Sequence, residues 1–261
     1  MTNRALHQHD LTAEAARSMV ATAGIRKTDT VLEAGAGTGQ LTAALLASGA
    51  EVHAVELDRD RLKRLEERFK KDISDGRLTL HAGDATRVAP RLRQGWRVVA
   101  NPPFNLTAAL IRRWLTSELP GGPPGALDLV LQFQAAKKLT PVPGAMTRSS
   151  VMSALFGAAK LTKKLRRDDV VPPSHVPLSG WSLRRAQDAP GAAELAEVDR
   201  VLQHGFSGPR TMREVMRKLL TVPQMKRQAA DHGWRLEHHP RTLAPEAWLA
   251  IASFLGRSGG A

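Results

Sequence analysis

A four-residue segment, Asn-Pro-Pro-Phe at residues 101–104, carries groups suited to holding an aromatic amine. Its two prolines fix the backbone dihedral angles and remove two N–H donors. The segment therefore presents acceptors, namely the Asn101 side-chain oxygen and the Pro102 carbonyl. Acceptors that bind both hydrogens of such an amine favour a pyramidal nitrogen whose lone pair points at an electrophile, and this positioning can supply much of a rate enhancement. No strong base is needed before the attack, because the proton can leave afterwards.

Phe104 adds an aromatic face beside these acceptors. Stacking of a nucleobase on such a ring contributes about 1–3 kcal/mol, and a base within a structured nucleic acid must be extruded to reach it. We predict that Asn101, Pro102 and Phe104 form the catalytic site for an adenine amine. The competing interpretation is a rigid proline turn that places Phe104 in the core.

A glycine-rich loop at residues 33–39, Glu-Ala-Gly-Ala-Gly-Thr-Gly, predicts a cofactor site. Gln40 stands where a dinucleotide fingerprint has its last glycine, which disfavours a pyrophosphate and an NAD-dependent oxidoreductase. A ligand lying along the loop, such as an amino-acid sulfonium, fits better. Glu33 either receives the ammonium group of this ligand through the local network or caps the loop. Residues without side chains let the backbone approach the ligand; they are Gly35, Gly37 and Gly39.

Two acidic residues end the next two predicted strands. Glu56 follows the loop by about 20 residues, where such folds place an acceptor for ribose hydroxyls. Asp84 ends the third strand and could accept a hydrogen bond from the cofactor's adenine amine. The alternative is that both residues cap the helices that follow them. Together with the loop they predict S-adenosyl-L-methionine as the cofactor, S-adenosyl-L-homocysteine as its product, and no metal site.

The elements that position these residues alternate between strands and helices, which predicts an open α/β sheet with mostly parallel strands. Strands are expected at residues 30–33, 51–56, 78–81, 96–100, 127–133 and 181–184. Helices are expected at residues 12–23, 41–48, 60–71, 107–115, 193–203, 211–220, 223–232 and 245–255. We predict a catalytic domain at residues 1–187 and a small all-helical, RNA-binding domain at 188–261.

The charge of the chain points to a polyanionic partner. Thirty-eight Lys and Arg face 25 Asp and Glu, giving a formal net charge of +13, and a basic domain is typical of nucleic-acid binders. The alternative interpretation is that the Lys and Arg clusters lie on solvated helix faces and contact no partner. Only 4% of residues are aromatic and Tyr is absent, so a platform of stacking rings is improbable. The candidate phosphate contacts are Arg112, Arg113, Lys137, Lys138, Lys160, Lys163, Lys164, Arg166, Arg167, Arg210 and Arg213.

Two compositional absences exclude further classes. The chain has no cysteine, which excludes disulfide scaffolds and thiolate metal sites. No apolar run approaches the roughly 20 residues that a membrane span needs, and no signal-peptide core follows the N-terminus. We expect a cytoplasmic monomer without a membrane partner.

Taken together, these segments resemble the ribosomal RNA adenine dimethyltransferases of the Erm and KsgA type. Residues 8–12, Gln-His-Asp-Leu-Thr, are similar to the family's N-terminal Gln-Asn-Phe-Leu segment, and residues 206–213 are similar to its Phe-Ser-x-x-Arg-Lys-Thr-Leu-Arg stretch. The resemblance implies a Rossmann-like class I methyltransferase domain. It also extends the predicted cofactor site, whose further members are Gln8, His9, Leu11, Leu57, Ala85 and Asn101.

Within the family the compact glycine loop and the Asn-Pro-Pro-Phe form favour the Erm branch. That branch methylates one adenine of 23S rRNA and confers resistance to macrolides, lincosamides and streptogramin B, so the resemblance implies mono- or dimethylation with this outcome. The alternatives are a KsgA-type 16S rRNA dimethyltransferase, a DNA adenine methyltransferase, and a non-catalytic RNA-binding or assembly factor. The intact acceptor motif argues against the last of these.

The sequence departs from the family pattern at two places. His9 and Asp10 replace the usual Asn and Phe. Family members also carry a Phe-x-Pro-x-Pro-Lys-Val segment whose aromatic closes over the target base, whereas residues 171–177 here contain no phenylalanine. His175 is a candidate substitute for this second stacking face, and a solvated loop histidine is the competing interpretation.

Overall fold

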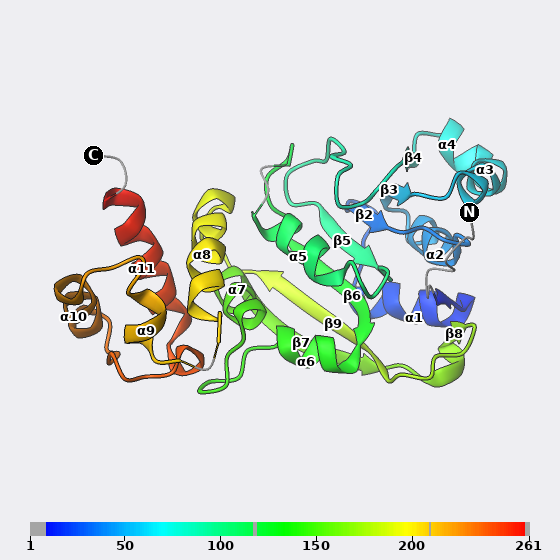
Figure 1. Cartoon of the computed structure of the whole chain (residues 1–261). Coiled ribbons are helices and arrows are strands. Elements are labelled where there is room, and N and C mark those ends of the chain that lie inside the picture. Colours follow the sequence, from blue (N-terminus) through cyan, green and yellow to red (C-terminus); the bar gives the residue numbers. More distant parts are fainter. Residues whose placement is uncertain (1–8, 117–118, 209, 259–261) are drawn as a thin grey trace, which may run out of the picture. The chain divides into compact units, whose positions relative to one another are not determined.

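The computed structural model describes residues 9–116, 119–208 and 210–258 (Figure 1). Their contacts group them into two compact units. One contains residues 9–114, 119–137 and 160–184; the other contains 115–116, 138–159, 185–208 and 210–258. The second unit therefore includes residues 138–159, which a single boundary after residue 187 assigns to the other domain.

The first unit is built around a seven-stranded sheet in the order β4-β3-β2-β5-β6-β9-β7. Neighbouring strands from β4 to β6 are parallel, and β9 is antiparallel to β6. The mostly parallel Rossmann-like sheet is thus confirmed. The strands are β1 (Asp10–Leu11), β2 (Thr30–Ala34), β3 (Glu51–Glu56), β4 (Leu78–Ala82), β5 (Arg97–Ala100), β6 (Ala126–Gln132), β7 (Gly157–Lys164), β8 (Val170–Val171) and β9 (Leu178–Arg185). The helices that begin in this part of the chain are α1 (Ala13–Ala23), α2 (Gln40–Ala47), α3 (Arg59–Arg68), α4 (Lys70–Ser74), α5 (Thr107–Thr116) and α6 (Phe133–Leu139), with a short 3-10 turn at Arg167–Asp169.

Helix α1 illustrates how local chemistry sets an element's ends. The Thr12 hydroxyl accepts a hydrogen bond from the backbone N–H of Ala15 at 3.2 Å, which satisfies one of the unpaired donors at the helix start. Gly24 ends the helix in the left-handed conformation at φ 64°, where a residue without Cβ carries no steric penalty. Val20, on the inward side, belongs to a core cluster that also contains residues of α2, β2 and β3.

The helix expected at residues 60–71 is two helices, α3 and α4, separated at Phe69. Phe69 has φ −110° and ψ 23°, outside the helical region, and is 6% exposed. Its ring lies under the glycine loop, since a Cβ on Gly39 would come within 2.8 Å of the Phe69 Cε2 atom. The break between the two helices therefore coincides with a buried aromatic side chain.

The basic run at residues 160–167 begins in a strand rather than on a helix face. Residues 160–164 belong to β7, the last strand at one edge of the sheet. The side chains of Lys160, Lys163 and Lys164 are exposed there, and charged residues on an edge strand hinder pairing with other chains.

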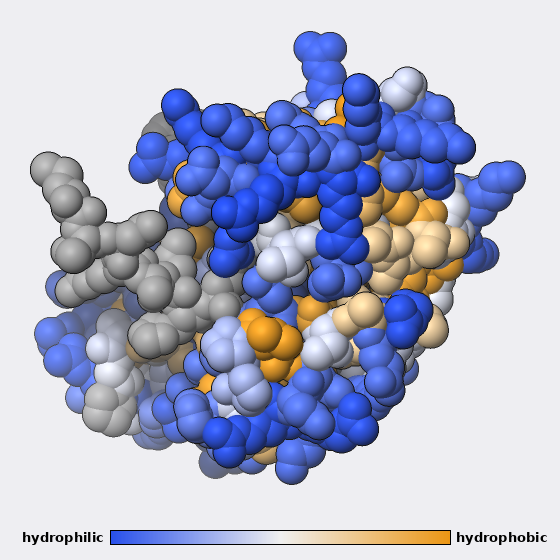
Figure 2. Space-filling view, turned by 90° about the vertical axis from the view of Figure 1, so that its right-hand side faces the viewer, coloured by the Kyte–Doolittle hydropathy of each residue, from blue (hydrophilic) through white to orange (hydrophobic). Residues whose placement is uncertain are grey.

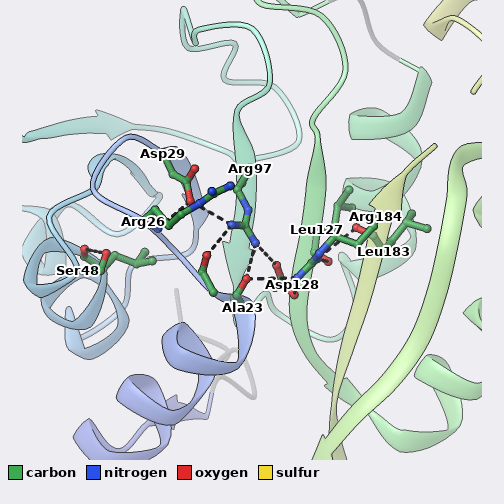
Figure 3. A network of polar contacts seen from close by, with 11 residues as sticks. Ala23, Arg26, Asp29, Ser48, Arg97, Leu127, Asp128, Leu183 and Arg184 are labelled. Carbon is green, nitrogen blue, oxygen red and sulfur yellow. Dashed lines mark hydrogen bonds and ion pairs between the residues drawn. The ribbon is translucent and has the colours of Figure 1, made fainter. Parts of the chain in front are cut away.

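A buried polar network joins the end of α1 to three strands (Figure 3). The Arg97 guanidinium on β5 donates to the Asp29 carboxylate at 3.1 Å, the Ala23 carbonyl at 2.6 Å and the Asp128 carboxylate at 3.2 Å. Arg184 on β9 donates to the other Asp128 oxygen at 2.8 Å. Such a network fixes its elements firmly, because removing one partner of a buried pair costs about 3–5 kcal/mol.

The second unit contains helices that pack through apolar side chains. They are α7 (Arg148–Phe156), α8 (Ala192–Gly205), α9 (Met212–Met216), α10 (Val222–Asp231) and α11 (Pro245–Ser258), with a 3-10 turn at Pro240–Thr242. The Trp248 ring of α11 is fully buried and lies against Gly205 of α8. Arg148 of α7 binds the Asp199 carboxylate of α8 with two hydrogen bonds of 2.8 and 2.7 Å. The four helices expected after residue 188 are present, and α9 is shorter than expected.

Among the described residues, no helix has the length and hydropathy that a membrane crossing requires.

Candidate cofactor and acceptor site

The glycine loop between β2 and α2 has a backbone that only glycine adopts easily. Gly35, Gly37 and Gly39 have φ values of 82°, 57° and 79°, in the left-handed region that other residues avoid. The N–H groups of Gly35 and Ala36 both donate to the Val55 carbonyl, at 2.9 and 3.1 Å. The loop is therefore held against the end of β3, and at Gly37 the absence of a Cβ leaves room for the Asp10 carboxylate.

Glu56, at the end of β3, holds this loop in place through hydrogen bonds. Its carboxylate is 5% exposed and accepts hydrogen bonds from the Gly37 N–H at 2.8 Å and the Asp58 N–H at 2.9 Å. Each carboxylate oxygen still has a lone pair for another donor. Glu56 thus organises the loop, and its hydrogen bond to a cofactor ribose stays a prediction.

Asp84 lies beside Glu56, because the Gly83 N–H donates to the Glu56 carbonyl at 2.9 Å. Asp84 accepts from the Thr86 hydroxyl at 2.7 Å and the Thr86 N–H at 2.8 Å. These bonds, the hydroxyl first, hold the pKa of Asp84 below its usual value. The carboxylate stays ionised and can only accept, as its predicted role requires. Two further predicted cofactor contacts follow these acids directly: Leu57, which is 61% exposed, and Ala85, which is half-buried.

Glu33 at the end of β2 is a different kind of acid. Its side chain is 1% exposed, and the Thr42 hydroxyl of α2 donates to it at 2.7 Å. Burial raises the pKa of Glu33 to about 8, against the lowering effect of the Thr42 bond, and the nearby Glu56 adds to the rise. At neutral pH this carboxyl is mostly protonated in the folded protein.

An open pocket of about 240 Å³ joins the loop to the acceptor motif. Its walls come from β1, the end of β2, the start of α2 and the end of β5. They are formed by Asp10, Leu11, Glu33, Gly35, Ala36, Thr38, Gln40, Leu41 and Asn101. The pocket lies along the glycine loop and is lined by Asp10 and Glu33, whose carboxyl oxygens can accept hydrogen bonds from the ammonium group of S-adenosylmethionine, and the ionised Asp84 suits its adenine end. The residues present therefore fit this cofactor.

The acceptor motif is oriented by the N-terminal segment. The Asn101 side-chain N–H₂ donates to the His9 carbonyl at 2.5 Å. A carbonyl can only accept, so this bond fixes which side of the Asn101 amide is the nitrogen and turns the oxygen the other way. Pro102 is buried, and Phe104 is half-buried and packs against the core cluster. The motif is thus a rigid turn, as the competing interpretation required, yet Phe104 keeps part of its ring exposed.

The N-terminal segment is itself clipped to a distant part of the chain. β1 pairs with β8, placing Asp10 opposite Val171 and Leu11 opposite Val170. The His9 ring donates through Nδ1 to the Pro172 carbonyl at 2.7 Å and lies 5.9 Å from the Phe104 ring between centroids. Asp10 and Leu11 of this clip contribute to the wall of the pocket. Gln8, the remaining predicted cofactor contact, lies outside the described residues.

The expected substitute for the second aromatic, His175, does not carry a described contact with Phe104. His175 is exposed and its Nδ1 lies 3.2 Å from the Arg167 guanidinium. The ring beside Phe104 is that of His9, which sequence reasoning treated only as a cofactor contact. The sequence signal for this ring was the replacement of the family's usual Asn by His at position 9.

Several candidate phosphate contacts have partners within the protein. Arg113 donates to the carbonyls of Arg87 and Val88 at 3.1 and 3.0 Å, and so supports the turn after Asp84. Arg166 pairs with Asp169 at 3.1 Å, and Arg213 with Glu237 at 3.6 Å. These arginines stabilise local structure in the described chain whatever else they bind.

The remaining candidates are exposed on the surfaces of their units. They are Arg112, Lys137, Lys138, Lys160, Lys163, Lys164, Arg167 and Arg210. Within this set Lys163 donates to the Ser18 hydroxyl at 3.1 Å, and the Lys137 ammonium lies 5.8 Å from the centre of the Phe133 ring. Figure 2 looks at the end of the molecule that carries α1, α3 and β8, and shows mostly hydrophilic side chains with smaller apolar areas between them.

A larger hollow of about 460 Å³ lies elsewhere, between α1 and strands β6, β7 and β9. Met19, Leu129 and Trp181 contribute to its apolar wall. It contains neither the glycine loop nor Asn101, so size alone does not identify the site.

The mostly parallel sheet, the glycine loop and the acceptor motif at its strand ends define an S-adenosylmethionine-dependent methyltransferase. The family model described as "Ribosomal RNA adenine dimethylase" matches residues 3–256. The chain belongs to this family, and with it to the rRNA adenine dimethyltransferases.

Relatives with assigned names support the same family. The "Ribosomal RNA small subunit methyltransferase A" of Parasynechococcus marenigrum is 34% identical over 254 residues, which cover 92% of this chain and 82% of the relative. The protein of the same name from Erythrobacter litoralis is 32% identical over 234 residues, covering 87% and 81%. These names agree better with the small-subunit alternative than with the expected 23S target and antibiotic resistance.

Solved structures confirm the fold. The crystal structure of a dimethyladenosine transferase from Plasmodium falciparum superimposes with a TM-score of 0.74 at 19% identity, covering 97% of this chain and 98% of that one. The crystal structure of the 23S rRNA methyltransferase ErmE gives 0.69 at 22% identity, covering 95% and 99%. Identities this low show a shared fold and leave the RNA target open.

Proposed function

We propose that this protein methylates the N6 amine of an adenine in small-subunit (16S) ribosomal RNA. The observation that carries the choice of RNA is the identity of 32–34% to proteins named for the small subunit, over most of both chains. The observation that carries the chemistry is the bond from the Asn101 amide to the His9 carbonyl, which leaves the Asn101 oxygen as the acceptor.

The proposed mechanism follows from these groups. The Asn101 oxygen and the Pro102 carbonyl accept the two hydrogens of the adenine amine, and Phe104 stacks on the base. When bound beside the glycine loop, Glu56 and Asp84, S-adenosylmethionine would supply a methyl group on a positively charged sulfur, and S-adenosylhomocysteine would be its product. Held in this way, the amine directs its lone pair at the methyl carbon, so that positioning lowers the barrier. The nitrogen then loses its extra proton to solvent.

Two acids with different charge states bind different parts of the cofactor: Asp84 is ionised, and Glu33 is mostly neutral. Asp84 accepts a hydrogen bond at the adenine end, while Glu56 accepts from the ribose and keeps the glycine loop in place. Glu33 presents its neutral carboxyl to the amino-acid end of the pocket. The exposed lysines and arginines, including Lys160 and Lys164, contact RNA phosphates, and each neutralised phosphate would steepen the salt dependence of binding.

A 23S rRNA adenine is the second candidate target. The compact Gly-Ala-Gly-Thr-Gly loop and the Asn-Pro-Pro-Phe form of the acceptor motif favour it, because these forms resemble the Erm branch. The two candidates share every chemical step and differ only in the RNA that reaches the pocket.

Transfer of a labelled methyl group to purified 16S and 23S rRNA, and to 30S and 50S particles, tests the proposal. Primer extension then maps the modified adenine, and the Asn101→Ala variant is the inactive control. We expect label in 16S rRNA or its particle. Label confined to 23S rRNA would establish the second candidate, and no label in any substrate would contradict both.

A further inference from the structure

We propose that the His9 ring forms the second aromatic face of the target-base site, opposite Phe104. The proposal rests on the proposed function, since it assumes an extruded adenine as the substrate. It assigns to the N-terminal segment a role for which the loop at residues 171–177 offers only His175, whose ring contacts Arg167.

Hydrogen bonds restrain the His9 ring and the backbone that follows it. Its Nδ1 donates to the Pro172 carbonyl at 2.7 Å, so the ring cannot rotate freely. The adjoining backbone is held by the β1–β8 pair and by the bond from the Thr12 N–H to the Asp169 carbonyl at 2.9 Å. The ring is thus a placed side chain rather than part of a loose terminus.

The spacing of the two rings is close to that of a base sandwich. The ring centroids of His9 and Phe104 are 5.9 Å apart and their planes are inclined by 32°. A flat base with about 3.5 Å of contact distance on each face needs two rings about 7 Å apart. An opening of about 1 Å together with a levelling of the tilt would admit the base. Both residues are half-buried, so neither is enclosed in the core.

No other aromatic side chain of the described residues is recorded in contact with Phe104. Val171 lies opposite Asp10 in the β1–β8 pair and is 57% exposed, but has no ring. His175 is engaged with Arg167. His, like Phe, Tyr and Trp, can stack on unpaired bases, so His9 is the residue that can complete the site.

Three substitutions separate the ring from its hydrogen bond. His9→Phe keeps a ring and loses the bond to Pro172; His9→Asn keeps a polar group and loses the ring; His9→Leu keeps apolar volume without a ring. All three leave the backbone carbonyl that orients Asn101. Unfolding midpoints and Kd for S-adenosylmethionine, measured by calorimetry, establish that each variant is folded and binds cofactor.

The test combines kinetics with fluorescence. The kinetics use a short rRNA fragment that contains the mapped adenine. For the fluorescence measurement this adenine is replaced by 2-aminopurine, whose emission drops when it stacks. We expect His9→Asn and His9→Leu to lower kcat/KM for RNA about tenfold and to lose the quenching seen with the wild type. We expect His9→Phe to stay within about threefold of the wild type.

The alternatives give different results. If His9→Asn and His9→Leu match the wild type in kcat/KM and quenching, the ring plays no part and the proposal is wrong. If His9→Phe falls with the other two, the hydrogen bond to Pro172 matters rather than stacking, and the proposal is equally wrong. Failure of the wild type to methylate either rRNA would instead remove the proposed function itself.

Discussion

The two halves of the site differ in how completely their polar groups are satisfied. On the cofactor side Glu33, Glu56 and Asp84 each accept hydrogen bonds from groups within the protein. On the acceptor side Asn101 is held through its nitrogen, and Phe104 packs against the core cluster and makes a tilted contact with His9. The cofactor half is preorganised, while the acceptor half is held in place but open.

This difference fits the two ligands. A small cofactor of fixed shape is best met by rigid acceptors, because preorganisation reduces the ordering cost of binding. A base extruded from a large RNA arrives with an orientation set by that RNA, and a slot that opens by about 1 Å can receive it. Substitutions in the two halves should therefore affect different constants, and the following predictions test that separation.

Asn101→Ala should give the largest effect. Removing the oxygen that orients the amine is expected to lower kcat by about 100-fold or more, while Kd for S-adenosylmethionine changes by less than about threefold because the loop and Glu56 remain. Methyl-transfer rates give kcat, and calorimetry gives the Kd for S-adenosylmethionine. Asn101→Asp, which keeps an acceptor oxygen but loses the bond to His9, should lie between. An equal loss in both constants for Asn101→Ala would contradict the separation.

Glu56→Gln should show the reverse pattern. The charged oxygens that hold the Gly37 N–H and accept from the ribose are replaced by one neutral oxygen, and hydrogen bonds to a charged group contribute about 1.5–3 kcal/mol. Kd for S-adenosylmethionine is expected to rise about 10- to 30-fold, with kcat at saturating cofactor little changed. Glu66→Gln, at an exposed position of α3, is the matched control. A fall in kcat alone would show that the halves are not separate.

Phe104→Ala should weaken methyl transfer about tenfold in kcat/KM for RNA, since one stacking face is lost. Phe104→Tyr and Phe104→Trp should retain much of the activity, because each keeps a ring. Full activity of the Ala variant in steady-state assays with saturating cofactor would exclude a stacking role.

Glu33 should give a pH dependence of stability. Its folded pKa of about 8 lies above the ordinary value of 4.5, so between these pH values the folded protein binds a proton that the unfolded chain has released. The free energy of unfolding should therefore fall as the pH rises from about 5 to about 8, by at most about 1.4 kcal/mol per pH unit from this group. Urea unfolding of the wild type and Glu33→Gln isolates the contribution, because Gln resembles the protonated acid. Parallel profiles for the two proteins would mean that Glu33 is ionised in the fold.

The periodicity of apolar residues, together with the residues that end helices and strands, was sufficient to predict most of the sheet. The strand at residues 51–56 and the helix between Thr12 and Gly24 were predicted with almost the same bounds as observed. The break at Phe69 was missed because sequence periodicity identifies an apolar side chain but does not show how deeply it is buried in the core. The β1–β8 pair was missed because two-residue strands carry no periodic signal and their partners lie far apart in sequence.

The site was predicted where a motif combines residue type with a position after a strand. The positions of Glu56 and Asp84 followed from that rule, and their ligand contacts stay predictions. The placement of the His9 ring depends on a bond to Pro172, 163 residues away, which no local pattern contains. The partners of Arg113 and Arg166 were missed for a similar reason, since charge counts do not show which cations are used within the fold.

The β1–β8 clip has a consequence for the order in which the molecule forms. Contacts between residues so distant in sequence are late and slow in folding, because the intervening loop must close first. A growing chain that has emerged only as far as β6 contains the glycine loop, Glu56 and Asn101, but not the strand that anchors the N-terminal segment. The acceptor site therefore becomes complete only after residue 172 has left the ribosome synthesising it.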